Sequence, residues 1–184
     1  MRHLKAYFLN GLIAFAMALF YSCDTSEKDT FLTDAFAGEP VGIAYNIRMV
    51  YTDSLRIKAI LTAPVNKDYT NLSLQYSEFP EGLKLTFIGE QAQENVITAD
   101  YGKLYQQTSL IDLRGNVVLN ASDGSQLKTP QLYWDAEQDW IFTEENFNFT
   151  NTEYNVFAKR LDTNKEFTKF KTGKLTGTVA VEEE

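Results

Sequence analysis

The feature that most constrains this chain is an alternation of apolar and polar side chains with a period of two, which fills most of the sequence after residue 40. Leu83, Leu85 and Phe87 alternate with polar neighbours, and Val117 and Leu119 do the same. This period is that of a β-strand, whose successive side chains point to opposite faces of a sheet. No apolar stripe of useful length at helical spacing occurs after residue 40. The alternation predicts an all-β domain over residues 41–184.

The longest alternating run begins at residue 55. It predicts one buried strand face, made by Leu55, Ile57, Ala59, Leu61 and Ala63. Turn-forming residues such as Ser122-Asp123-Gly124 separate the alternating segments at short intervals. Strands that follow one another through short turns predict antiparallel hairpins.

The alternating segments also repeat about every 30 residues. Residues 99–104, 129–134 and 158–163 align at offsets of 30 and 29. A second set aligns at offsets of 30 and 32: Gly115-Asn116-Val117, Glu145-Asn146-Phe147 and Gly177-Thr178-Val179. A fainter earlier copy begins at Ala63-Pro64. A helix-free unit of this length is a hairpin, and stacked hairpins bury a shared apolar interior. Chance spacing within an all-β protein is the alternative.

Strand parity selects a set of apolar side chains that point together into this interior. The set is Ile111, Leu113, Val117, Leu119, Leu132, Trp134, Ile141, Phe147 and Phe149. It contains three aromatic rings and no charged residue. Two interpretations stay open, an ordinary hydrophobic core or an apolar groove that opens to accept a lipid.

The N-terminal residues predict a secretory signal. A basic start is followed by an apolar run over residues 6–19 and by the only cysteine of the chain, Cys23. The run is shorter than the roughly 20 apolar residues that a transmembrane helix needs. The position of Cys23 is similar to that of the lipid-modified cysteine of bacterial lipoproteins. The sequence predicts a signal peptide over residues 1–22, lipid attachment at Cys23 and a flexible acidic tether over residues 23–40. An uncleaved membrane anchor is the alternative to the cleaved signal.

Composition excludes several classes of function. Seventeen Lys and Arg residues against 25 Asp and Glu give a net charge of −8, which is unfavourable for nucleic-acid binding. One cysteine cannot close an internal disulfide, and one histidine, His3, cannot build a zinc site of the usual kind. The paired carboxylates Asp135 and Asp139, or Glu144 and Glu145, are those of solvated turns rather than of a glycosidase. We expect no enzyme activity, no cofactor and no metal site.

Several segments resemble the LptC family of lipopolysaccharide-export periplasmic proteins. The segments are Leu61-Thr62-Ala63-Pro64, Glu78-Phe79-Pro80-Glu81-Gly82-Leu83, Thr98-Ala99-Asp100-Tyr101-Gly102, Leu113-Arg114-Gly115-Asn116-Val117-Val118-Leu119, Asp123-Gly124-Ser125-Gln126-Leu127-Lys128-Thr129 and Leu132-Tyr133-Trp134-Asp135. Together they cover about residues 43–182. The better-known members of the family carry a membrane helix where this chain has Cys23.

The resemblance implies an OstA-like fold, an open twisted β-jellyroll built from stacked antiparallel hairpins. It also implies a non-enzymatic protein that is tethered to the inner membrane in the periplasm. Such a protein accepts lipopolysaccharide from an inner-membrane ABC exporter and passes it to the next jellyroll of a periplasmic bridge. Unpaired edge strands allow subunits to join by sheet extension. We expect the exporter-facing edge near Ile43–Tyr51 and the downstream edge near Phe167–Val181.

Two further interpretations come from the residues themselves. Basic residues cluster near the C-terminus, where they either face lipid phosphates or protect an edge strand from aggregation: Lys159, Arg160, Lys165, Lys169, Lys171 and Lys174. The alternative function is that of a surface lipoprotein in which a β-sandwich binds glycans. It predicts aromatic side chains exposed on a flat face, whereas a lipid carrier predicts them lining a concave one.

Overall fold

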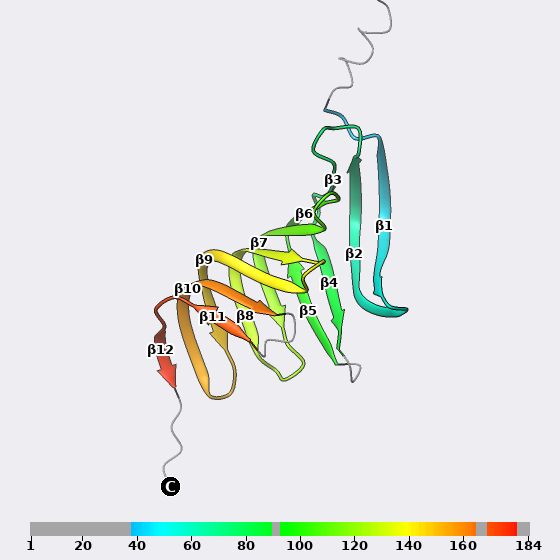
Figure 1. Ribbon diagram of the computed structural model, residues 1–184. Coiled ribbons are helices and arrows are strands. Elements are labelled where there is room, and N and C mark those ends of the chain that lie inside the picture. The colour runs from blue at the N-terminus through cyan, green and yellow to red at the C-terminus, as the bar shows by residue number, and fades with distance from the viewer. Residues whose placement is uncertain (1–37, 90–92, 165–168, 180–184) are drawn as a thin grey trace, which may run out of the picture. The chain divides into compact units, whose positions relative to one another are not determined.

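The computed structural model describes residues 38–89, 93–164 and 169–179 (Figure 1). The expected signal peptide, Cys23 and most of the expected tether lie outside these residues. The described part contains strands and no helix. The strands are β1 (Gly42–Asp53), β2 (Arg56–Tyr69), β3 (Tyr76–Phe79), β4 (Leu83–Ile88), β5 (Glu94–Ala99), β6 (Tyr101–Tyr105), β7 (Leu110–Asn120), β8 (Gln126–Asp135), β9 (Trp140–Thr150), β10 (Tyr154–Asn164), β11 (Phe170–Thr172) and β12 (Thr176–Val179). The all-β prediction is confirmed.

All twelve strands join one antiparallel sheet, consistent with a β-jellyroll, and the order of the strands in space follows their order along the chain. β3 and β4 act as two halves of one long strand, because β2 pairs with both of them. β5 and β6 form another such strand against β7, and β11 and β12 a third against β10. The sheet is therefore a meander of long strands that can be followed by colour in Figure 1. β1 lies at one end of it, and β11 with β12 lies at the other.

The long strands bend near their midpoints, so the sheet forms two facing layers. Layer A consists of β3, β6, β11 and the adjoining halves of β2 and β7 to β10. Layer B consists of β4, β5, β12 and the other halves of the same strands. The two layers meet at their inner faces, where Phe87 of β4 packs edge-on against Trp134 of β8 with ring centroids 4.7 Å apart. The apolar core lies between the layers.

The bend runs through residues that break a regular ladder of hydrogen bonds. It passes Pro64 in β2, Gly82, Asp100, Gly115 in β7 and Pro130 in β8. Gly115 has φ of 72° and begins a bulge that leaves one extra residue in β7 relative to β8. A bulge of this kind bends a strand and lets it pass from one layer to the next. The Asp100 backbone N–H donates to the Gly115 carbonyl at 3.0 Å, which fixes the β5–β6 corner against this bulge.

The strand register confirms the repeat along its first set of segments. Thr62 and Thr98 pair with Lys84 from opposite sides, and Lys128 and Phe157 likewise flank Asn148. Because Val118 joins Thr98 to Lys128, these positions are equivalent in four successive units. The fainter copy at Ala63-Pro64 belongs to the same series, at an offset of 36 from Ala99.

The predicted position of the last segment of the second set, Gly177-Thr178-Val179, was wrong by four residues. Phe157 pairs with Asn148 of β9 and with Thr176 of β12, so Leu175, and not Val179, corresponds to Phe147. The third bend therefore lies at Gly173, whose N–H donates to the Lys159 carbonyl at 3.2 Å. Gly177 therefore matches Gly115 in residue type but not in structural position. The expected spacing between the two sets of segments does not fit the last unit, because β11 is short. At the second bend β9 keeps its extra residue although Glu145 replaces glycine.

The expected buried face of β2 begins later than predicted. Ala59, Leu61 and Ala63 are buried, whereas Ile57 is exposed and Leu55 is fully exposed in the turn between β1 and β2. Ser54 and Leu55 both have positive φ, the conformation of a two-residue hairpin turn. The alternation continued through a turn that contains no glycine or asparagine to mark it.

Candidate functional site

The nine side chains expected to form a groove lie on the inner faces of the two layers. All of them are buried except Phe149, which is partly buried and packs against the others. Parity holds across the bulge of β7, since Ile111 and Leu113 face inward from layer A while Val117 and Leu119 face inward from layer B. The structure brings the set together as one continuous apolar interior with two different ends.

At the β1 end the interior is filled by three rings. Ala59 of β2 pairs with Tyr51 on one side and with Phe87 on the other, and both rings pack edge-on against Trp134 from the opposite layer. The Tyr51 and Trp134 centroids are 5.5 Å apart. The small side chain of Ala59 leaves room for the indole between its two neighbours. Burial raises the pKa of Tyr51 to about 12, because the phenolate would lose its water.

At the β12 end the interior opens into a cavity of about 450 Å³. Three members of the predicted set, Leu119, Phe147 and Phe149, line this cavity, together with Leu127, Val156, Leu161, Leu175 and several polar side chains. The inward row of layer B runs from Leu119 through Leu127, Phe149 and Val156 to Gly177. Gly177 contributes no side chain, so the row stops short of the last strand. A Cβ at Gly177 would collide with the Asn155 carbonyl oxygen and the Val156 Cα, so the close pairing of β12 with β10 requires glycine at this position.

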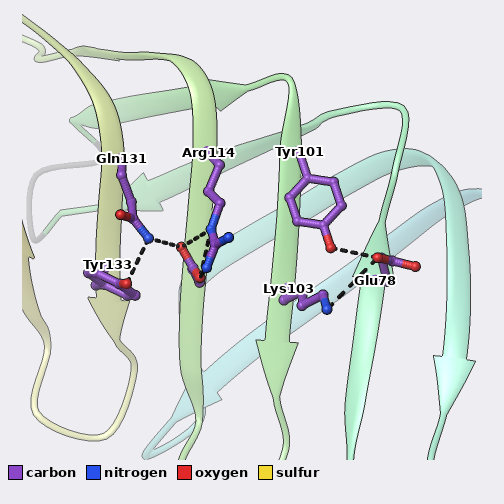
Figure 2. Close-up of polar contacts among 7 residues, drawn as sticks. Glu78, Tyr101, Lys103, Arg114, Gln131 and Tyr133 are labelled. Carbon is purple, nitrogen blue, oxygen red and sulfur yellow. Dashed lines mark hydrogen bonds and ion pairs between the residues drawn. The ribbon is translucent and has the colours of Figure 1, made fainter.

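The outer face of layer A carries a polar network that the sequence analysis did not identify (Figure 2). Its centre is Asp112 of β7, which is only 2% exposed although it points away from the core. Arg114 donates to both carboxylate oxygens, with its shortest contact at 2.6 Å, and Gln131 donates to the same carboxylate at 2.8 Å. The hydrogen bonds and charge of Asp112 raise the pKa of Arg114. The buried charge is thus fully paired.

A second polar cluster lies beside the first, on β3 and β6 (Figure 2). The Tyr101 hydroxyl donates to the Glu78 carboxylate at 2.5 Å, and the Lys103 ammonium lies 4.0 Å from the same oxygen. The ammonium also lies 4.4 Å from the centroid of the Tyr76 ring. Burial, and then the hydrogen bond to Glu78, raise the pKa of Tyr101. Register explains the cluster, because Glu78, Lys103 and Asp112 are direct neighbours on three adjacent strands.

Aromatic rings accompany these charges on the outer face. Tyr69 stacks on Tyr76 at 4.7 Å, and Tyr133 stacks on Phe142 at 5.0 Å. All four rings are half-buried. The molecule therefore has aromatic side chains both between the layers and on the outer face of layer A. The sequence does indicate these outer rings, because the tyrosines occupy the outward positions that alternate with the core residues along the same strands.

The basic cluster near the C-terminus is divided by the fold. Lys159 and Lys174 line one shallow polar pocket near the bend, together with Asn146 and Asn148. Arg160 is paired with Glu144 at 3.6 Å and Asp162 at 3.3 Å. Lys169 and Lys171 lie at the β11 end of the sheet, and Lys165 lies outside the described residues. The cations of the described residues do not converge on one point.

No group of three or more histidine, cysteine, aspartate or glutamate side chains is placed to hold a metal ion in the described part of the chain. Within residues 38–89, 93–164 and 169–179, no helix is long and apolar enough to span a membrane.

Comparison with protein families decides the identity of the fold. A family described as "Lipopolysaccharide-assembly, LptC-related" matches residues 12–176, which is most of the chain. The chain belongs to the LptC family. No curated protein matches it in sequence. The resemblance seen in the sequence is therefore confirmed at the level of the family.

Membership in the LptC family implies a role in lipopolysaccharide transport. The family consists of transport and binding proteins that are periplasmic and associated with the inner membrane, and its partners are lipopolysaccharide and the Lpt transport complex. The family match spans all of the described bends and every residue that lines the cavity. The interior between the layers is consequently the part of this LptC-family chain to examine for the lipid.

Proposed function

We propose that this LptC-family protein carries the acyl chains of lipopolysaccharide between its two layers, accepting the lipid from an inner-membrane ABC exporter and passing it to the next jellyroll of a periplasmic bridge. The observation that carries this proposal is the continuity of the apolar interior from Trp134 at the β1 end to the cavity beside Phe149 at the β12 end. No catalytic residue, cofactor or metal takes part in this role.

The physical need for such an interior comes from the lipid. Exposing each CH₂ group to water costs about 0.8 kcal/mol, so a single chain of about 14 carbons costs roughly 10 kcal/mol in a bare aqueous crossing. A carrier must cover every chain and still release it. The nine predicted groove residues supply the apolar surface, and the cavity of about 450 Å³ supplies space for part of one chain without any movement. Further chains require the layers to part.

The layers would separate at the side where only side-chain contacts hold them together. At the bend they are joined by continuous strands, whereas at the opposite side Trp134 meets Tyr51 and Phe87 through ring contacts only. Such contacts separate without breaking backbone pairing. The two layers can therefore separate at the side opposite the bend, while the continuous strands at the bend act as the hinge.

We also propose the anchoring that the sequence indicates. Residues 1–22 act as a signal peptide, Cys23 receives the lipid, and residues 23–40 tether the jellyroll of residues 41–184 to the inner membrane. Residues 38–40 are the only described part of this tether. Mass spectrometry of the mature N-terminus tests this arrangement, and an uncleaved chain would replace the lipid anchor with the membrane anchor.

The carrier role is tested by site-specific photo-crosslinking in growing cells. A photoreactive residue replaces Trp134 or Phe149, and the matched controls are the adjacent outward positions Tyr133 and Asn148 on the same strands. The inward positions should yield adducts with lipopolysaccharide, and the outward ones should not. Equal labelling of inward and outward positions, or adducts only at Tyr133, would count against transport between the layers. The second result would favour glycan binding on the outer aromatic face.

A further inference from the structure

Two buried polar atoms face the β1 end of the interior without a hydrogen-bond partner among the described residues. They are the indole Nε1 of Trp134 and the hydroxyl oxygen of Tyr51. Trp134 is 1% exposed, and its ring lies 5.5 Å from that of Tyr51. Trp134 packs against the rings of Tyr51 and Phe87, within an apolar cluster that also contains Ala59.

Such atoms are costly to bury. A donor that is removed from water without a new acceptor destabilises the folded state, so most buried N–H and O–H groups are paired. A phenylalanine at either position would provide a ring of similar shape without this cost. Two further buried atoms of the described residues have no partner: Asn66 Oδ1 in β2, and Thr172 Oγ1, whose residue lines the cavity at the β12 end. Unpaired polar atoms thus occur at both ends of one apolar interior.

We infer that Trp134 and Tyr51 form a polar selection site that recognises a hydroxyl group on a fatty acyl chain. This inference rests on the proposed function and specifies the kind of chain that the interior prefers. A hydroxyl oxygen accepts from the Trp134 N–H, and the same hydroxyl donates to, or accepts from, the Tyr51 hydroxyl. An unsubstituted methylene group does neither. Chains that carry a hydroxyl therefore bind in preference to plain chains of the same length.

The position of the site agrees with this role. Tyr51 belongs to β1, the end strand of the sheet, which pairs with β2 alone among the described strands. A chain that enters beside β1 meets Tyr51 and Trp134 first and reaches the cavity beside Phe149 last. Trp134 is almost fully buried and packs against the Tyr51 ring, so this ring must move aside as the chain arrives.

One other arrangement would satisfy the indole. Both ring pairs are edge-to-face, with interplanar angles of 72° and 87°, and an indole N–H can donate weakly to the face of a neighbouring ring. The Phe87 face is the better candidate, because its centroid is nearer. A variant at Phe87 therefore serves as the control that separates the two arrangements.

The test compares two probes on the full chain, purified in amphipol: 3-hydroxytetradecanoate and tetradecanoate, each displacing a fluorescent fatty acid. The readout is the ratio of the two affinities, in which the contribution of the amphipol is the same for every variant. The wild type should prefer the hydroxylated chain about 5-fold, the value of one net hydrogen bond. Trp134→Phe and Tyr51→Phe should each bring this ratio close to one. Phe87→Leu removes apolar volume beside the same indole, so it should weaken both probes and leave the ratio unchanged.

A second measurement guards against a variant that merely misfolds. Removing an unpaired buried hydroxyl should raise the unfolding midpoint of Tyr51→Phe by about 2–4 °C without ligand. A wild type that binds both probes equally would overturn the selection site while leaving lipid transport intact. So would a ratio that changes in Phe87→Leu as much as in Trp134→Phe. Failure to bind either probe would instead remove the proposed function itself.

Discussion

The two ends of the interior differ in how they are closed, although both are made by the same hairpin unit. At the β1 end, Trp134 is buried and packs edge-on against the rings of Tyr51 and Phe87. At the β12 end, the inward row of layer B stops at Gly177, and a cavity of about 450 Å³ stays open. The interior therefore has a direction, because three packed rings fill one end and a cavity lies at the other. In the proposed carrier, an acyl chain would enter the filled end only after the rings move. It would leave the open end without such a movement.

The sharpest test of this direction concerns the end strands themselves. Proline removes a backbone donor and prevents another strand from pairing at that position. Thr178→Pro in β12 should abolish capture of the downstream bridge protein and leave co-purification of the exporter intact. Tyr45→Pro in β1 should do the reverse, with at least a 10-fold loss in each case if two or more backbone hydrogen bonds are lost.

The controls for these variants are Thr178→Val and Tyr45→Val, which keep the backbone donor at the same position. Both should retain both partners. Parallel loss of the two partners in either proline variant, with an unchanged unfolding midpoint, would show that the two ends do not have separate partners.

A second prediction compares the packing of the two ends. Trp134→Ala should lower the free energy of unfolding by about 3–5 kcal/mol, because it removes a fully buried ring and leaves a closed cavity. Phe149→Ala should cost only about 1–2 kcal/mol, because this ring is partly buried and already borders open space. Urea unfolding of both variants measures the difference. Similar costs would mean that the cavity at the β12 end closes in solution.

Much of this arrangement was predictable from the sequence, because it depends on parity. Alternation alone placed Leu132, Trp134 and Ile141 inside, and the repeat gave the correct equivalence of the first set of strands. The register of the last unit was not predictable, because it depends on β11 being short. Leu55 was misplaced because nothing in its residue type marks the turn in which it lies. The side-chain contacts at the two ends of the interior were not predictable, because they depend on which rings meet in three dimensions.

The outer face of layer A shows a different limit. Parity correctly separates Asp112 and Arg114 from the core residues between them, but an exposed strand face also alternates charges in this way. Only the register shows that Glu78, Lys103 and Asp112 are neighbours, and that Gln131 and Arg114 cover the carboxylate of Asp112. Burial of a charge on an outward face depends on long side chains from three strands, which no single segment of the sequence reveals.

The smallest predicted effect uses pH to measure how well the β1 end is sealed. Burial raises the pKa of Tyr51 from 10 to about 12, so the folded state keeps this proton when the unfolded chain has lost it. The free energy of unfolding is therefore unaffected by this group below pH 10 and falls as the pH rises from 10 towards about 12, because only the unfolded chain ionises there. Other tyrosines titrate in the same range, so the informative quantity is the difference between the wild type and Tyr51→Phe. The variant should gain about 1–2 kcal/mol over the wild type between about pH 9 and about pH 11.5, measured by urea unfolding. A difference that stays constant with pH would mean that water reaches the Tyr51 hydroxyl, and that the β1 end stands as open as the β12 end.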